Sequence, residues 1–257
     1  MDSFLRLTQI VAQLRAPDGC PWDREQTSET LRASLIEESA EVLQAIESRD
    51  DANLCEELGD LILQPLFHAQ IAAEEGRFTL DEVLNGICEK LVRRHPHVFG
   101  DVTAENSAEV LKNWDAIKLG EKAARGEVSA SVLGDIPPDL AALSQALKIS
   151  KRAAKVGFEW PDEAGVVAKL REETLEIEAA LQAESTARVA EEIGDLLFTA
   201  VNMARWRGIN PELALRDVNR KFVARFEKME AEAKARGLEL EELTAEQWEE
   251  LWQRAKG

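Results

Sequence analysis

Acidic residues recur in two sets of four at one spacing, an E-x-x-E pair followed by an E-x-x-D pair that begins 19 residues after the first Glu. The sets are Glu38, Glu41, Glu57 and Asp60, and Glu173, Glu176, Glu192 and Asp195. Residues at i and i+3 share one side of a helix, so an antiparallel helical hairpin brings four carboxylates together. Two like charges about 4 Å apart repel by about 4 kcal/mol at an intermediate dielectric, and a hard divalent cation relieves this repulsion. Oxygen ligands suit Mg²⁺, with Mn²⁺ as a substitute, and Mg²⁺ shares its shell with substrate phosphates.

A single E-x-x-E pair is more often a solvated helix face than a metal site. Here the acids lie on or beside apolar helix faces, and two hairpins carry the same internal spacing. The repetition favours a metal site, although a duplication copies a structural motif as readily as a functional one.

A basic pair follows each acidic hairpin. Lys221 and Arg225 are four residues apart and share a helix face, and Lys90 and Arg94 repeat this spacing in the first half. A Lys point charge and an Arg fork are the groups that bind a triphosphate. An isolated pair of this kind usually makes surface ion pairs, but its recurrence favours phosphate binding.

Other candidate residues carry weaker signals. Glu172 and Glu191 each precede one of the acids and are candidate general bases. A helix turns each of them about 100° from its neighbour, so an equally weighted interpretation places both on a solvated side of the helix. Trp252 belongs either to a core or to a stack on a nucleotide base. His95 and His97 lack a nearby third ligand, and we interpret them as structural.

The elements that position these residues are predicted to be helices. Apolar residues recur every three or four positions almost throughout, and alternating β-branched runs are missing, which predicts an all-α fold. The segment from Glu38 to Leu61 repeats at an offset of 135 residues, and the basic pairs repeat at 131. We therefore predict two tandem helical-bundle domains that arose by internal duplication. The predicted boundaries are 1–120 for the N-terminal domain, 121–138 for a polar linker with Gly and Pro, and 139–257 for the C-terminal domain.

The composition is acidic, with 31 Lys and Arg against 49 Asp and Glu and a net charge of -18. This balance argues against binding to a nucleic-acid polymer, which needs clustered positive charge, but not against a nucleotide whose phosphates arrive with a cation. No apolar run is long enough for a membrane span, and the N-terminal segment lacks the apolar core of a signal peptide. The three cysteines show no metal-binding spacing, so we expect reduced thiols and a cytoplasmic location.

Longer segments resemble the MazG family. In the first half these segments are GCPWDREQT, LIEESAEVLQAI, EELGDLILQ, RRHPHVFGD and VLKNWDAIK, and in the second half AAKVGFEWPD, EEIGDLLFTAVNMAR and NRKFVARFEKME. The resemblance covers nearly the whole chain. It implies an Mg²⁺-dependent nucleoside triphosphate pyrophosphohydrolase of the all-α type, which acts as a homodimer and converts NTPs and dNTPs to monophosphates and pyrophosphate.

The resemblance also implies roles for individual residues. The metal ligands are Glu173, Glu176, Glu192 and Asp195, the phosphate-binding pair is Lys221 and Arg225, and Trp252 lies beside the base. Lys169, Arg188 and Asn219 are further candidates for substrate binding. The C-terminal domain is expected to be catalytic and the N-terminal domain structural or regulatory. The first copy is nevertheless a candidate second site, formed by Glu38, Glu41, Glu57, Asp60, Lys90 and Arg94. It has Cys88 in place of Asn219 and no evident counterpart of Trp252.

Two other functions remain open at this stage. One is a non-catalytic module that senses nucleotide or Mg²⁺ and acts through a regulatory protein partner. The other is a helical scaffold whose acids are only solvated. For the enzyme, we expect a role in cleansing the nucleotide pool.

Overall fold

The computed structural model describes residues 2–124, 126, 131–134, 136–138, 140–183 and 185–256. All regular structure in these residues is helical, which confirms the prediction of an all-α fold. Within the same residues, none of the helices has an apolar stretch of the length and purity needed to cross a membrane.

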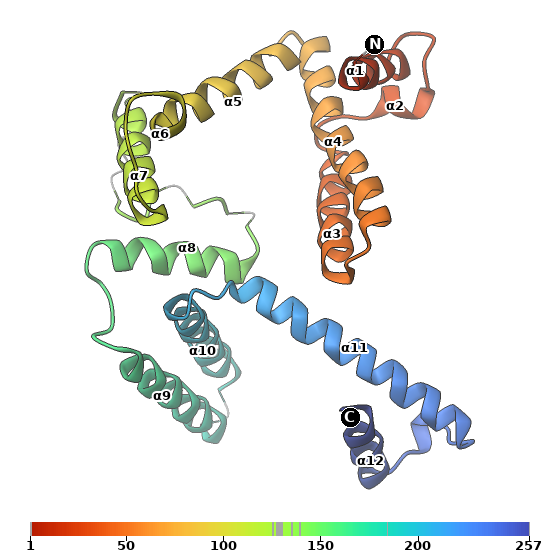
Figure 1. Cartoon of the computed structure of the whole chain (residues 1–257). Coiled ribbons are helices and arrows are strands. Elements are labelled where there is room, and N and C mark those ends of the chain that lie inside the picture. The colour runs from red at the N-terminus through yellow and green to blue at the C-terminus, as the bar shows by residue number, and fades with distance from the viewer. Residues whose placement is uncertain are drawn as a thin grey trace. The chain divides into compact units, whose positions relative to one another are not determined.

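The chain divides into two compact units, Met1–Glu127 and Val128–Gly257 (Figure 1). The helices of the first unit are α1 (Ser3–Leu14), α2 (Pro21–Glu25), α3 (Arg32–Ser48), α4 (Asp51–Glu74), α5 (Leu80–Arg94), α6 (Pro96–Phe99) and α7 (Ser107–Ala124). Those of the second are α8 (Ala142–Lys155), α9 (Glu163–Gln182), α10 (Thr186–Trp206), α11 (Pro211–Ala235), the 3₁₀ turn η1 (Leu240–Glu242) and α12 (Ala245–Lys256). Of the predicted linker 121–138, residues 121–124 belong to α7, and residues 125, 127–130 and 135 lie outside the described residues.

A tight turn makes α3 and α4 an antiparallel hairpin. Arg49 ends α3 in the left-handed region with φ 58°, and Asp50 then caps α4 by accepting bonds from the backbone N–H groups of Ala52 and Asn53, each at 3.1 Å. The negative charge of a capping carboxylate also interacts favourably with the positive end of the helix dipole. The turn therefore sets the pairing of α3 with α4, on which the convergence of Glu38, Glu41 and Glu57 depends.

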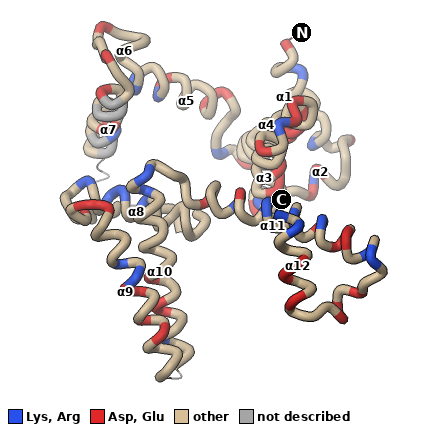
Figure 2. The backbone as a smooth tube through the Cα atoms, turned by 60° about the horizontal axis from the view of Figure 1, so that its bottom comes forward, with Lys and Arg blue, Asp and Glu red and all other residues tan. Residues whose placement is uncertain are grey.

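The second unit builds the corresponding hairpin from α9 and α10. Asp162 caps α9 by accepting a bond from the Gly165 N–H at 2.8 Å. Ser185 caps α10 by accepting from the Arg188 N–H at 3.4 Å, at the position that Asp50 occupies in the first hairpin. Figure 2 shows acidic residues along both α9 and α10.

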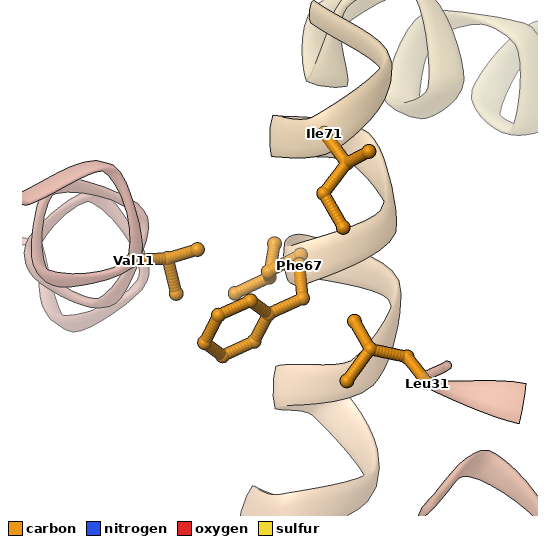
Figure 3. Packing of buried hydrophobic residues seen from close by; sticks show 5 residues of the cluster. Val11, Leu31, Phe67 and Ile71 are labelled. Carbon is orange, nitrogen blue, oxygen red and sulfur yellow. The ribbon is translucent and has the colours of Figure 1, made fainter. Parts of the chain in front are cut away.

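Each unit has a small apolar cluster away from the acids. In the first unit, Val11 of α1 and Leu31 point toward Phe67 of α4, with Ile71 one turn further along (Figure 3). In the second unit, Met229 and Ala233 of α11 pack against Leu251 and Ala255 of α12. Burying such side chains stabilises the folded chain by roughly 1.5 to 3 kcal/mol for each large one.

Large apolar side chains remain exposed on the helices of the second unit. They include Leu175, Leu181, Ile193, Leu197 and Phe198 of α9 and α10, and Leu213, Leu215, Val218, Phe222 and Val223 of α11. Exposed apolar surface of this extent is typical of a face that another protein surface covers.

Candidate metal and triphosphate site

The acids of the C-terminal hairpin converge between α9 and α10. Carboxylate oxygens of Glu173, Glu192 and Asp195 all lie within 4.8 Å of one another, and Glu173 and Glu192 are only 3% and 8% exposed. Glu176 lines the same pocket beside them. The helical spacing explains this arrangement, because Glu192 and Asp195 are i and i+3 on α10 and face α9.

Basic side chains enter the same pocket. Lys169 Nζ lies 2.8 Å from Glu172, 2.9 Å from Glu173 and 3.9 Å from Glu176. Hydrogen bonds to Glu172 and Glu173 raise the pKa of Lys169, so it stays charged. Arg188 Nε lies 3.4 Å from Glu192. The two basic residues proposed from the sequence as substrate contacts therefore neutralise part of the acid cluster.

The remaining charge fits a hard divalent cation. Desolvation raises the pKa of Glu176, and its neighbours Glu173 and Glu192 add to the shift. The donors are all carboxylate oxygens, two of them from buried residues, and this is the ligand chemistry that Mg²⁺ and Mn²⁺ prefer.

The two candidate general bases differ in their surroundings. Glu191 lines the pocket with the acids. Glu172 is absent from the pocket lining, and its carboxylate is bound to Lys169. A base must reach a water in the pocket, so the geometry favours Glu191 over Glu172.

The basic pair of α11 forms a separate group in the single chain. Arg225 lies over the ring of Trp252 with 5.6 Å to the centroid, and Lys256 lies over the same ring at 5.3 Å. Asn219 and Lys221 are exposed on α11. None of these five residues is among those lining the acid pocket between α9 and α10. The structure thus presents two separate groups, an acidic pocket between α9 and α10 and a basic group beside the ring of Trp252.

The N-terminal hairpin also brings its acids together. Carboxylate oxygens of Glu38, Glu41 and Glu57 lie within 4.8 Å of one another. Desolvation raises the pKa of both Glu38 and Glu57, and repulsion from Asp60 and Glu41 adds to both shifts. Among the described residues, His95 and His97 belong to no such group of potential metal ligands.

The N-terminal unit does contain a counterpart of Trp252, so the absence expected from the sequence was wrong. Arg94 lies over the ring of Trp114 at 5.2 Å, and Lys118 lies over it at 5.4 Å. Arg225, Trp252 and Lys256 form the same arrangement in the other unit. A W-x-x-x-K pattern that begins at Trp114 and again at Trp252 was the signal for this pair, and it also identifies Lys256 as an additional basic residue of the C-terminal group.

The N-terminal copy of the basic pair is already bound within its own unit. Arg94 Nη2 lies 2.5 Å from Glu121 Oε2, and Arg93 Nε lies 2.6 Å from Glu121 Oε1. A guanidinium held by a carboxylate is a poor ligand for a phosphate. Arg225 has no such carboxylate within ion-pair distance among the described residues.

The ion pairs of Glu121 with Arg93 and Arg94 lead us to expect that acid weakens the attachment of α7 to α5. The two arginines lower the pKa of Glu121 from 4.5 to about 2, chiefly through hydrogen bonds from Arg94 and Arg93. Because the folded-state pKa lies below the unfolded one, the stabilisation is complete above about pH 4.5 and is lost as the pH falls toward 2. We expect Glu121→Gln to lower the melting temperature at pH 7, with the difference from wild type narrowing below pH 4.5. Circular-dichroism melts across this pH range measure the difference in melting temperature, with a substitution of an exposed acid, Glu89→Gln, as control. A difference that is independent of pH would contradict the role assigned to the Glu121 ion pairs.

The fold and the site define a class of protein: two tandem helical units, each with an acid-lined hairpin followed by a helix that carries a Lys/Arg pair. The MazG nucleotide pyrophosphohydrolase domain matches residues 26–99 and 162–230. The chain therefore belongs to the MazG family of nucleotide pyrophosphohydrolases.

Similar proteins extend over the full chain. The nucleoside triphosphate pyrophosphohydrolase/pyrophosphatase MazG of Thermotoga maritima is 46% identical over 99% of this chain and 96% of its own length. The nucleoside triphosphate pyrophosphohydrolase of Escherichia coli K12 is 48% identical over 100% of this chain and 98% of its own length. The protein of the same name from Mycobacterium tuberculosis is 37% identical over 72% of this chain and 54% of its own length.

Proposed function

We propose that this protein is an Mg²⁺-dependent nucleoside triphosphate pyrophosphohydrolase whose catalytic site lies in the C-terminal unit. The observation that carries the proposal is the convergence of Glu173, Glu192 and Asp195 within 4.8 Å in a chain of this family. The names of the full-length relatives support nucleoside triphosphates as the substrates. The products are a nucleoside monophosphate and pyrophosphate.

The C-terminal acids would hold the cation. Glu173, Glu176, Glu192 and Asp195 supply its oxygen ligands. Mg²⁺ bound there would lower the pKa of a nearby water and neutralise charge on triphosphate oxygens. Glu191, in the lining of the same pocket, accepts the proton of the attacking water.

The basic residues would act on the triphosphate. Lys169 and Arg188 are the cations inside the pocket, where they now balance the acids. Both carry the positive charge that would bind phosphate oxygens of a triphosphate in this pocket. Lys221 and Arg225 stabilise the charge that develops on the departing pyrophosphate. Trp252 offers a flat ring to a base, and Asn219 offers an amide to the sugar or a phosphate.

We propose a homodimer as the active form. In one chain, Lys221, Arg225 and Trp252 are absent from the lining of the acid pocket. Exposed apolar side chains on α10 and on α11 supply surfaces that a second copy would bury. In a two-fold dimer, α11 of one protomer would complete the pocket of the other.

The N-terminal unit has a different role in this proposal. Its Arg94 is bound to Glu121 and Trp114, which removes the group that corresponds to the triphosphate ligand Arg225. We therefore assign this unit a structural or regulatory role, with a regulatory protein partner as one form of it. We propose a cytoplasmic location, which free cysteines favour, and a role in cleansing the nucleotide pool.

A product assay tests the proposal directly. The purified chain is incubated with a panel of NTPs and dNTPs and Mg²⁺, and pyrophosphate is resolved from orthophosphate. We expect pyrophosphate in stoichiometric amounts with the monophosphate, and none after the metal is removed with EDTA. Saturable nucleotide binding without turnover would support the alternative, a non-catalytic module that senses nucleotide or Mg²⁺. Orthophosphate as the product would contradict the proposed reaction.

A further inference from the structure

A network of polar side chains joins α8 to α10 in the interior of the second unit. Ser150 of α8 and Asn202 of α10 are 4% and 2% exposed, and the Ser150 hydroxyl donates to Asn202 Oδ1 at 2.5 Å. The same hydroxyl accepts from Arg205 Nε at 2.6 Å, and Asn202 Nδ2 donates to the backbone oxygen of Phe198 at 3.0 Å. Two directional bonds thus connect one hydroxyl of α8 to two side chains of α10.

The network continues into the loop that precedes α9. Arg205 Nη2 donates to Glu159 Oε1 at 2.7 Å, and Trp206 Nε1 donates to the same oxygen at 3.0 Å. Burial raises the pKa of Glu159, but hydrogen bonds from Arg205, the Trp160 N–H and Trp206 outweigh it and lower the pKa, so the carboxylate stays charged. The end of α10 is therefore fastened both to α8 and to the segment from which α9 starts.

The first copy has no such network between the corresponding helices. At the offset of 135 residues, Phe67 stands at the position of Asn202 and packs in the apolar cluster of the first unit. Arg15 stands at the position of Ser150 and binds Glu74. Apolar contacts are the simpler way to join two helices, because buried polar groups lose water and must all find partners. A polar junction in the copy with the proposed catalytic acids therefore favours a role in the geometry of that site.

The network and two of the acids belong to one helix. Asp195 and Asn202 are seven residues apart on α10, so they lie on the same side of it, two turns apart. Side-chain ends lie about 5 to 6 Å from a helix axis, so a rotation of α10 by about 20° moves them by about 2 Å. Apolar contacts tolerate such a rotation, whereas hydrogen bonds weaken when they lose their alignment. The network therefore holds Glu192 and Asp195 at the angle at which they meet Glu173 of α9.

We propose that Ser150, Asn202 and Arg205 are positioning residues of the reaction, which set the rotation of α10 and with it the geometry of the acid pocket. This inference rests on the function proposed for that pocket. None of the three is among the described residues that line the pocket, so they act through Glu192 and Asp195 rather than on the substrate. A misplacement of about 1 Å from a distant mutation costs about 100-fold in rate, so a loosened α10 should lower kcat at least about tenfold.

A double variant, Ser150→Ala with Asn202→Leu, removes the network from the full-length protein. Replacing both partners of a buried hydrogen bond by apolar groups of similar shape is close to neutral for stability, so we expect a melting temperature within a few degrees of wild type. At saturating Mg²⁺ we expect kcat for pyrophosphate release to fall at least about tenfold, with KM for the NTP within about twofold. Thr199→Val is the matched control, because it alters another buried polar residue of α10 outside the network and should keep kcat within about twofold of wild type.

Hydrogen–deuterium exchange measured by mass spectrometry, without metal or nucleotide, gives a readout besides activity. We expect faster exchange across α10 in the double variant than in wild type or Thr199→Val, because local opening follows the loss of contacts that hold an element. Arg205→Lys is a second variant, since a single ammonium lacks the fork that bonds Ser150 and Glu159 together. We expect it to fold and to show a smaller loss of kcat in the same direction.

The possible results separate this inference from the proposed function. A folded double variant with wild-type kcat would overturn the inference, and so would a lower kcat without faster exchange across α10. An equal loss of kcat in Thr199→Val would also overturn it, because any buried polar change would then have the same effect. A wild-type protein that releases no pyrophosphate would contradict the proposed function, whereas the exchange would still decide whether the network fixes α10.

Discussion

Glu192→Gln is expected to lower the rate of pyrophosphate release at least about 100-fold. Mutating a residue that only supports a metal ligand typically lowers metal affinity or activity about 10- to 100-fold, and losing a direct ligand should cost at least as much. Glu192 is 8% exposed and shares the cluster with Glu173 and Asp195. The amide keeps the shape of the side chain but removes one of the negative charges that would hold Mg²⁺. Steady-state kinetics over a range of Mg²⁺ concentrations measure the effect.

A matched control lies in the other hairpin. Glu57→Gln makes the same chemical change at the equivalent position of the first copy, where Arg94 is bound to Glu121. We expect it to retain most of the activity at saturating Mg²⁺. Glu192→Gln removes a charge from a repulsive cluster, so its melting temperature in EDTA should not fall below that of wild type. Equal loss of activity in both variants would contradict the assignment of catalysis to the C-terminal unit.

Arg225→Ala is expected to have the second-largest effect, about 100-fold or more on turnover. Its guanidinium has no carboxylate partner among the described residues and lies 5.6 Å from the centre of the Trp252 ring. Charge that stabilises a departing phosphoryl group in a site shielded from water contributes strongly to the rate. Rates with single NTPs, analysed as separate changes in kcat and KM, measure the loss.

Mixed dimers of the two inactive variants test where α11 acts. If α11 of one protomer completes the pocket of the other, a dimer of Glu192→Gln with Arg225→Ala has one intact site and one doubly altered site. Random pairing makes half of the dimers mixed, so co-expressed variants should recover about a quarter of the wild-type activity. No recovery would contradict a site shared between protomers. The double variant paired with wild type is the control, because a shared site leaves that mixed dimer inactive.

The sequence by itself determined the helical architecture and the grouping of the acids. Helical periodicity is a local property, and residues three or four positions apart share a face whatever surrounds them. The repeated E-x-x-E and E-x-x-D pairs therefore predicted hairpins with converging carboxylates, and the structure brings Glu38 near Glu57 and Glu173 near Glu192. The duplication was visible for the same reason, since it preserved these spacings.

Only the tertiary structure decided which groups share a pocket and which charges are already paired. Glu121 lies 27 residues from Arg94, and its capture of that arginine depends on how α7 packs against α5. The stack of Arg225 on Trp252 likewise depends on how α12 folds back on α11. Sequence spacing fixes the direction of a side chain on its own helix, whereas the partner it meets is set by contacts between distant segments, and those contacts distinguish the two copies.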